Sequence, residues 1–167
     1  TGMQPEFLRI VLEKMSTLGA DISTTKNSIS VDMRNRVIQP VEIDTQVYPG
    51  FPTDMQAQFA AIASIAAGTS YIRENIFENR FLYAKELSRL GAKISIDGNT
   101  ATIIGQKSLH SAPVMATDLR ASASLVIAAL AAKGKSIIDR VYHIDRGYEH
   151  IEEKLRFLGT NITRIST

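Results

Sequence analysis

The 167-residue sequence contains no cysteine and no long uninterrupted apolar run. Without cysteine the chain has no disulfide bond and no thiolate metal ligand, which is typical of a protein from a reducing compartment. Its longest apolar stretches are rich in alanine and are too short to span a bilayer, and we recognise no signal peptide before them. We therefore expect a cytoplasmic protein with no membrane partner.

A marked excess of charge is also lacking, because 19 Lys and Arg residues against 17 Asp and Glu residues leave a net charge of +2. No basic run alternates with aromatic residues, so we expect no nucleic-acid partner, although this balance still allows a local anion site. The three histidines, His110, His143 and His150, are not spaced like metal ligands, so packing or solvent-facing roles are favoured. We expect neither a metal nor a cofactor. With 44% hydrophobic residues, a chain of this length suits one domain with a buried core.

A Leu-Gly-x-x-Ile motif occurs three times in the sequence, at residues 18–22, 90–94 and 158–162. Each copy ends a stretch with helical apolar periodicity, and its glycine is typical of a left-handed helix cap. A segment of alternating polarity follows each glycine. In the first two copies turn residues interrupt this segment, at Lys26-Asn27 and at Asp97-Gly98, so each predicts a β-hairpin.

Two further segments, Asp54 to Ala67 and Arg120 to Ala132, are apolar nearly all round. This pattern predicts buried helices rather than surface helices. A glycine and then β-branched residues follow each of them, which predicts a strand before the next amphipathic helix. The repeating unit is therefore predicted as strand, helix, strand, helix and hairpin.

Four charged residues stand at corresponding places in this repeat. Arg80 follows Asp54 by 26 residues and Arg146 follows Arg120 by the same 26, so the spacing pairs Asp54 with Arg120 and Arg80 with Arg146. Repeat symmetry brings equivalent element ends to one rim of a domain. A carboxylate and three arginines on that rim predict a site for an anionic substrate together with a proton acceptor.

Simpler interpretations of these charges remain open at this point. Asp54 could be the N-cap of its helix, because a carboxylate is favourable there. Arg120 lies in a first helical turn, where a cation opposes the helix dipole, so an ion pair with Asp118 competes with a bound anion as its partner. Arg80 and Arg146 are expected at the openings of amphipathic helices, where guanidinium groups beside free N–H groups suit phosphate.

Four stretches of the sequence, spread over essentially the whole chain, carry a resemblance to a known family. They are Tyr48–Phe59 (YPGFPTDMQAQF), Phe77–Phe81 (FENRF), Ala116–Leu125 (ATDLRASASL) and Tyr142–Glu149 (YHIDRGYE). In these stretches the chain resembles the UDP-N-acetylglucosamine enolpyruvyl transferases. The resemblance implies an inside-out α/β barrel (mixed α+β), in which two similar domains are each built from three βαβαββ units, with helices inside and sheets outside. Residues 1–167 would then form most of the second, C-terminal domain.

The resemblance also implies an activity, the transfer of the enolpyruvyl group of phosphoenolpyruvate to the 3-hydroxyl of UDP-N-acetylglucosamine with release of phosphate. This reaction is the first committed step of bacterial peptidoglycan synthesis. The resemblance implies that Asp54 is the general base and that Ile76 contacts the uridine portion. Arg120 and the catalytic Arg146 would bind phosphoenolpyruvate, and Arg80 would be a third cation of the site. Asp118 would orient Arg120.

The same resemblance implies a partner and leaves other functions to be weighed. The family's general acid, Cys or Asp, lies on a loop of the N-terminal domain, so this chain would carry half of an active site and be inactive alone. One alternative is 5-enolpyruvylshikimate-3-phosphate (EPSP) synthase, whose sequence differs in the four stretches quoted above. Another is an RNA 3′-terminal phosphate cyclase-like module, which the lack of an extended basic surface disfavours. A further alternative is a noncatalytic domain that binds a nucleotide sugar.

Overall fold

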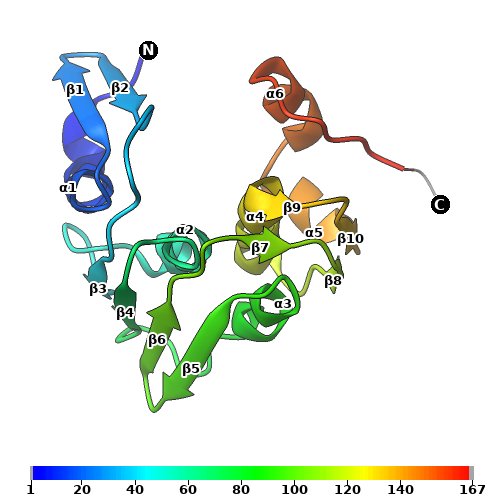
Figure 1. The fold of residues 1–167 in the computed structure, drawn as a ribbon. Helices are drawn as coiled ribbons and strands as arrows, with labels where there is room; N and C mark the ends of the chain where they lie inside the picture. Colours follow the sequence, from blue (N-terminus) through cyan, green and yellow to red (C-terminus); the bar gives the residue numbers. More distant parts are fainter. Residues whose placement is uncertain (1, 166–167) are drawn as a thin grey trace.

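The structure, a computed structural model that describes residues 2–165, contains one full copy of the predicted unit (Figure 1). In order, this copy consists of β3 (Glu42–Asp44), α2 (Gln56–Ala63), β4 (Thr69–Arg73), α3 (Tyr83–Arg89), β5 (Lys93–Asp97) and β6 (Thr100–Ile104). Its strands form one sheet in the order β3-β4-β6-β5, with β3 parallel to β4 and the other pairs antiparallel. The predicted βαβαββ unit is thus confirmed in this part of the chain.

A second copy of the unit follows, and it is incomplete within the described residues. It consists of β7 (Leu109–His110), β8 (Pro113–Met115), α4 (Leu119–Ala131), β9 (Ala132–Lys133), β10 (Ile137–Asp139), α5 (Tyr142–Asp145) and α6 (Ile151–Phe157). Strand β8 pairs with β10 and β7 pairs with β9, both in parallel. The alternating segment predicted after Gly159 forms no strand up to residue 165, because no partner strand lies beside it there and a lone strand is not stable.

The N-terminal part contains a one-turn helix η1 (Pro5–Leu8), α1 (Arg9–Thr17) and the hairpin β1 (Asp21–Thr25) and β2 (Ser28–Asp32). This hairpin turns at Lys26-Asn27, as predicted. The second hairpin turns at Gly98-Asn99, one residue later than predicted, because Asp97 still pairs with Thr100 in the ladder. The three predicted helix caps are confirmed by positive φ angles of +101° at Gly19, +96° at Gly91 and +91° at Gly159.

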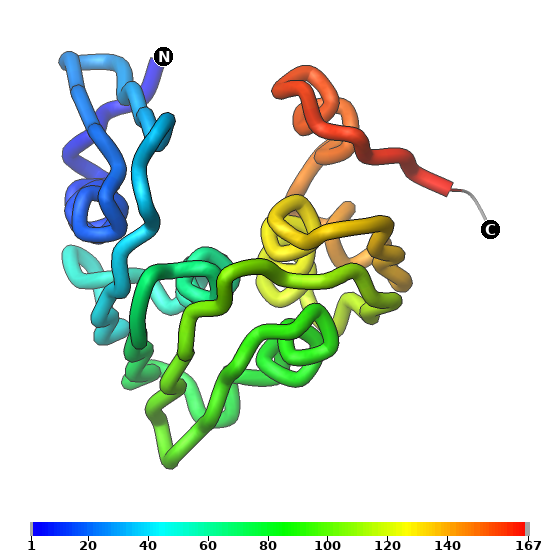
Figure 2. The backbone as a smooth tube through the Cα atoms, in the orientation of Figure 1, coloured from blue at the N-terminus to red at the C-terminus, as the bar shows by residue number. Residues whose placement is uncertain are grey.

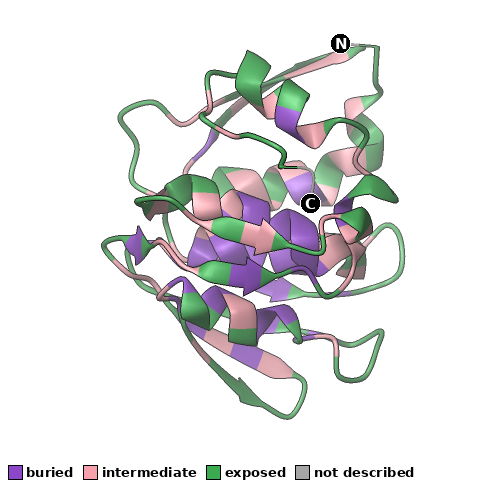
Figure 3. Ribbon diagram, turned by 90° about the vertical axis from the view of Figure 1, so that its right-hand side faces the viewer, coloured by how far each residue is buried: buried purple, intermediate pink, exposed green. Residues whose placement is uncertain are grey.

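Helices α2 and α4 pack against each other at the centre of the molecule, and the strands lie outside them (Figures 1 and 3). Leu125 of α4 is fully buried and Phe59 of α2 nearly so, each contributing about 1.5–3 kcal/mol through apolar burial. The two buried helices are therefore confirmed. Helix α2 ends at Ala63 rather than at the predicted Ala67, and its C-cap residue Ser64 donates its hydroxyl to the Ala60 carbonyl.

The chain runs from the β1–β2 hairpin on one side of this helical centre to α6 on the other (Figure 2). Among residues 2–165, no helix combines the length and the apolar character that crossing a membrane requires.

Candidate functional site

A cleft of about 520 Å³ opens where the chain enters α2. Three of the residues singled out in the sequence, Asp54, Ile76 and Arg120, line it together. The remaining lining residues come from η1 and α1, from the loop before α2 and from the loop after β4: Phe7, Leu8, Ile10, Val11, Gln46, Val47, Tyr48, Gly50, Pro52, Thr53 and Phe77. The cleft thus combines apolar walls with the charged side chains of Asp54 and Arg120.

Asp54 is the centre of this charged cluster. It lies in the short 3-10 turn η2 (Thr53–Met55), and it caps neither this turn nor α2. Instead its Oδ1 accepts hydrogen bonds from Nε of Arg120 at 2.5 Å and from Nη2 of Arg80 at 3.1 Å. The N-cap interpretation of Asp54 is therefore wrong, because charge-assisted bonds to two guanidinium groups are stronger than bonds to neutral amides.

The second oxygen of Asp54 is the reactive feature of the cluster. Within residues 2–165, both hydrogen bonds to the carboxylate fall on Oδ1 and none falls on Oδ2. The side chain is 56% exposed, so this oxygen can reach a bound molecule. An ionised carboxylate with one oxygen held and one oxygen open is suited to accept a proton from a bound hydroxyl.

Asp118, and not Asp54, acts as a helix cap. It is the N-cap of α4, and its Oδ1 accepts from the backbone amides of Arg120 at 2.8 Å and Ala121 at 3.0 Å. Arg120 therefore turns its side chain to Asp54, and the ion pair considered between Arg120 and Asp118 is wrong. Asp54 and Arg120 keep the paired places that the spacing predicted, because each lies two residues after an N-cap, Pro52 for η2 and Asp118 for α4.

The two remaining arginines differ in position. Arg80 lies in the loop before α3, where its Nη1 donates to Oγ1 of Thr53 at 3.0 Å and its guanidinium lies 4.4 Å from the centre of the Phe77 ring. Arg146 is exposed at the C-cap of α5, five residues before α6, and not at a helix opening as predicted. Among the described residues, Arg146 makes no hydrogen bond or ion pair with the Asp54 cluster, so the structure joins Arg80 but not Arg146 to it.

The arginines set the protonation of the cluster. The hydrogen bond from Arg120 is the main influence that holds the pKa of Asp54 below its ordinary value, and it outweighs the opposing effect of burial. The same hydrogen bond raises the pKa of Arg120. Asp54 is therefore ionised at neutral pH. An anion that draws Arg120 or Arg80 away from it would raise its pKa and make it a stronger base.

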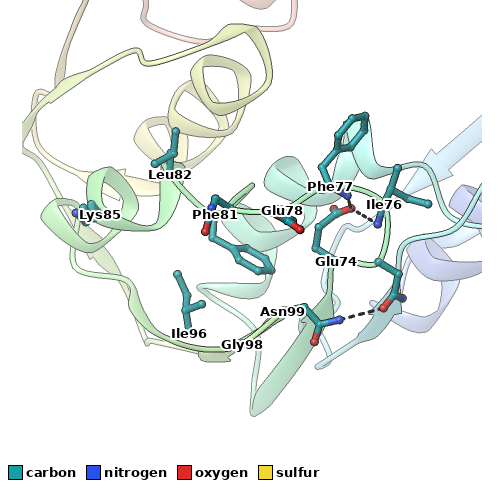
Figure 4. A pocket seen from close by; sticks show the side chains of 12 residues that line it. Glu74, Ile76, Phe77, Glu78, Phe81, Leu82, Lys85, Ile96, Gly98 and Asn99 are labelled. Atoms are coloured by element: carbon teal, nitrogen blue, oxygen red, sulfur yellow. Dashed lines mark hydrogen bonds between the residues drawn. The ribbon is translucent and has the colours of Figure 1, made fainter.

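A second cleft of about 700 Å³ adjoins the first and shares Ile76 and Phe77 with it (Figure 4). Phe77 and Thr53 were not assigned roles from the sequence, although both lie in the stretches that carry the family resemblance. Their position in those stretches was the only signal available. The contacts of Thr53 and Arg80 depend on two loops meeting in the fold.

The segment that carries Arg146 is tied to the C-terminal residues by Arg164. Its guanidinium binds Asp145 at 2.7 Å and Glu152 of α6 at 2.9 Å. The hydrogen bond from Arg164 lowers the pKa of Glu152 to about 2. A carboxyl whose folded pKa is lowered adds stability above its ordinary pKa near 4.5, and this contribution is lost as the pH falls towards 2.

We expect Arg164→Gln to return the pKa of Glu152 towards its ordinary value, because the bonds that stabilise the ionised form are removed. The measurement is a ¹³C NMR titration of the glutamate carboxyls. Arg156→Gln is the matched control, since Nε of Arg156 donates only to the backbone oxygen of Glu152. A Glu152 that titrates near 4.5 in the unchanged chain would refute the assignment.

The chain is similar to a family model and to curated proteins over nearly all of its length. The family model of EPSP synthase (3-phosphoshikimate 1-carboxyvinyltransferase) matches residues 1–155. The UDP-N-acetylglucosamine 1-carboxyvinyltransferase of Psychrobacter sp. (strain PRwf-1) is 57% identical over 162 residues, which are 97% of this chain and 37% of the relative. The protein of the same name from Rhodopseudomonas palustris (strain TIE-1) is 54% identical over 166 residues, 99% of this chain and 39% of the relative. The chain thus spans less than two fifths of these curated relatives.

Solved structures give the same picture of the fold. The enolpyruvyl transferase NikO from Streptomyces tendae superposes with a TM-score of 0.85 at 30% identity, over 93% of this chain and 36% of that one. EPSP synthase from Acinetobacter baumannii superposes with a TM-score of 0.73 at 16% identity, over 98% of this chain and 38% of that one. At that identity the second likeness bears on the fold alone. Together they confirm the predicted inside-out α/β class.

Proposed function

Because the chain belongs to the EPSP synthase family of 1-carboxyvinyltransferases, we propose that it forms part of an enzyme that transfers the enolpyruvyl group of phosphoenolpyruvate to UDP-N-acetylglucosamine. The observation that carries this proposal is the arrangement of Asp54, which lines the cleft. Its Oδ1 accepts hydrogen bonds from Arg80 and Arg120, and its Oδ2 is left available to a bound substrate. The choice of acceptor follows from the relatives. The chain is 54–57% identical to proteins named UDP-N-acetylglucosamine 1-carboxyvinyltransferase, and 16% identical to an EPSP synthase.

The residues of the cleft suit the steps of such a transfer. The 3-hydroxyl of the sugar gives its proton to Oδ2 of Asp54 as its oxygen forms a bond to C2 of phosphoenolpyruvate, and the double bond opens as the methylene carbon takes a proton from the general acid. Phosphate then leaves from C2 while the new methyl group loses a proton, which restores the double bond in the product. Arg120 grips the anionic groups of phosphoenolpyruvate with its planar guanidinium, and Arg146 joins it when the substrates are bound. Ile76 on the cleft wall meets the uridine portion, while Asp118 fixes the first turn of α4 from which Arg120 projects.

Binding of phosphoenolpyruvate would also activate the base in this scheme. Its phosphate and carboxylate compete with Asp54 for Arg120, and loss of that hydrogen bond raises the pKa of Asp54. The carboxylate would then become a better proton acceptor at the moment when both substrates are present. Asp54 would thus be held as a weak base until the anionic substrate arrives.

We also propose that this chain forms most of the second of two domains and that the first domain supplies the general acid. The two domains would close around both substrates, and holding the reactants together removes much of the entropic barrier. The reaction would commit the amino sugar to peptidoglycan, and thus serve cell-wall growth, in the cytoplasm, where both phosphorylated substrates are available.

The proposal is tested in a protein in which this chain is joined to the segment that precedes the matched region in the Psychrobacter relative, here called the completed transferase. Phosphate release from phosphoenolpyruvate is measured with UDP-N-acetylglucosamine and, separately, with shikimate 3-phosphate. We expect turnover with the nucleotide sugar only, and none from the 167-residue chain alone. Turnover with shikimate 3-phosphate only would show that the proposed acceptor is wrong. Turnover by the 167-residue chain alone would refute the proposal that it carries only half of the active site.

A further inference from the structure

Glu74, at the end of β4, is a buried carboxylate to which the mechanism above gives no role. It is only 3% exposed, and no arginine or lysine forms an ion pair with it among residues 2–165. Five hydrogen-bond donors from four segments converge on its two oxygens instead. They are the hydroxyls of Thr45 and Thr53, the side-chain amide of Gln56 and the backbone amides of Ile76 and Phe77.

These donors keep the carboxylate ionised despite its burial. Burial by itself would raise the pKa of Glu74, but the hydrogen bonds from Thr53, the two backbone amides and Thr45 outweigh it and leave the pKa below its ordinary value. A buried charge without an ion-pair partner is costly unless hydrogen bonds replace its water shell. The chain therefore maintains this charge in the wall of the second cleft, next to the first.

An unbroken set of hydrogen bonds leads from Glu74 to the reactive carboxylate. The hydroxyl of Thr53 donates to Oε2 of Glu74 at 2.7 Å and accepts from Nη1 of Arg80 at 3.0 Å. The other terminal nitrogen of Arg80 donates to Asp54 at 3.1 Å. Since an ionised carboxylate only accepts, it fixes the direction of the Thr53 hydroxyl, and a lone pair of that hydroxyl is left facing Arg80.

We propose that Glu74 is a positioning residue, which aims Arg80 at Asp54 through the hydroxyl of Thr53. Its other oxygen also holds the wall shared by the two clefts, because Oε1 accepts from the amides of Ile76 at 2.9 Å and Phe77 at 3.0 Å (Figure 4). One buried charge thus fixes both the arginine beside the base and the loop beneath the uridine portion of the acceptor. The role in catalysis rests on the proposed function.

The substitution Glu74→Gln tests the polarity of this network with little change in volume. Glutamine places an NH₂ group where Oε2 now accepts from Thr53 and Gln56. Two NH₂ groups, that of the new glutamine and that of Gln56, would then face each other. Gln56 cannot turn its amide round to avoid this, because its own oxygen already accepts from the hydroxyl of Tyr83 at 2.7 Å. The Thr53 hydroxyl would therefore rotate to accept from the new amide, and Arg80 would lose its fixed position.

The experiment compares Glu74→Gln, Thr53→Val, the double variant and a control in the completed transferase. The control is Ser70→Ala, which removes another fully buried side-chain acceptor from β4, one that binds the amide of Val41 and has no hydrogen bond to the cluster. We expect Glu74→Gln and Thr53→Val each to lower kcat/KM about tenfold. The double variant should show the same loss as either single variant, because both act on one path.

The structural readout is the crystal structure of the Glu74→Gln chain, in which Arg80 should have left Asp54. Ser70→Ala should lower the melting temperature, while kcat/KM and the position of the Arg80 side chain stay unchanged. If losses in the double variant multiply to about a hundredfold, or if Arg80 remains on Asp54, the positioning role is overturned. A completed transferase without any turnover would overturn the proposed function instead, and the position of Arg80 would then decide the inference alone.

Discussion

Replacing Asp54 with Asn in the completed transferase is expected to lower kcat by about 10²–10⁴-fold, the usual cost of losing a general base. The amide keeps the shape of the side chain but does not take up a proton from the sugar hydroxyl. Because the Asp54 carboxylate is 56% exposed, its ion pairs contribute less than about 1 kcal/mol to stability. The loss of rate should therefore come without a large change in melting temperature.

Asp44→Asn is the matched control for this substitution. Asp44 is also a half-exposed aspartate, and it binds Arg73 at 2.5 Å outside the lining of the cleft. We expect that variant to keep the unmodified rate. An Asp54→Asn enzyme that turns over as fast as the unmodified one would leave Asp54 as an anchor for the arginines and remove it as the base.

Replacing Arg120 with Lys should weaken the binding of phosphoenolpyruvate by about 10- to 100-fold, which corresponds to roughly 1.5–3 kcal/mol for a charge-assisted contact. Within the described residues, Arg120 uses only Nε of its side chain, on Asp54, so both terminal nitrogens remain available for an anion. Lysine keeps the charge but lacks the planar fork that grips phosphate and carboxylate with paired bonds.

Affinity for phosphoenolpyruvate and melting temperature are measured on the same variant, with Arg73→Lys as the matched control. Arg73 forms an ion pair of the same length with Asp44, and it does not line the cleft. We expect that control to bind phosphoenolpyruvate normally. Normal affinity in Arg120→Lys, together with a lower melting temperature, would show that Arg120 serves as scaffold for Asp54 and does not bind the substrate.

The parts of the fold that could be predicted are those encoded in short stretches of sequence. Helices α2 and α4 were predictable because residues that are apolar all round require burial, and the hairpins were predictable from turn residues after a glycine cap. The absence of a strand after Gly159 was not, since a strand forms only when a partner lies beside it. That partner is a property of the whole fold.

The candidate site was predictable in its residues but not in its contacts. Asp54 and Arg120 each stood out at a helix opening, but the simpler interpretations of both were wrong, because Asp54 caps no helix and Arg120 pairs with Asp54 rather than with Asp118. Their contact requires α2 and α4 to pack side by side, which no local pattern encodes. Glu74 was missed for a related reason, since a lone glutamate at a strand end resembles a solvated residue until four segments close around it.

The most direct measurement is a crystal structure of the completed transferase with UDP-N-acetylglucosamine and a phosphoenolpyruvate analogue bound. We predict that the 3-hydroxyl of the sugar lies about 2.6–3.2 Å from Oδ2 of Asp54, with the analogue's anionic groups on the terminal nitrogens of Arg120. A sugar bound elsewhere, with Oδ2 of Asp54 facing only solvent and Arg120 still bound to Oδ1 alone, would contradict it.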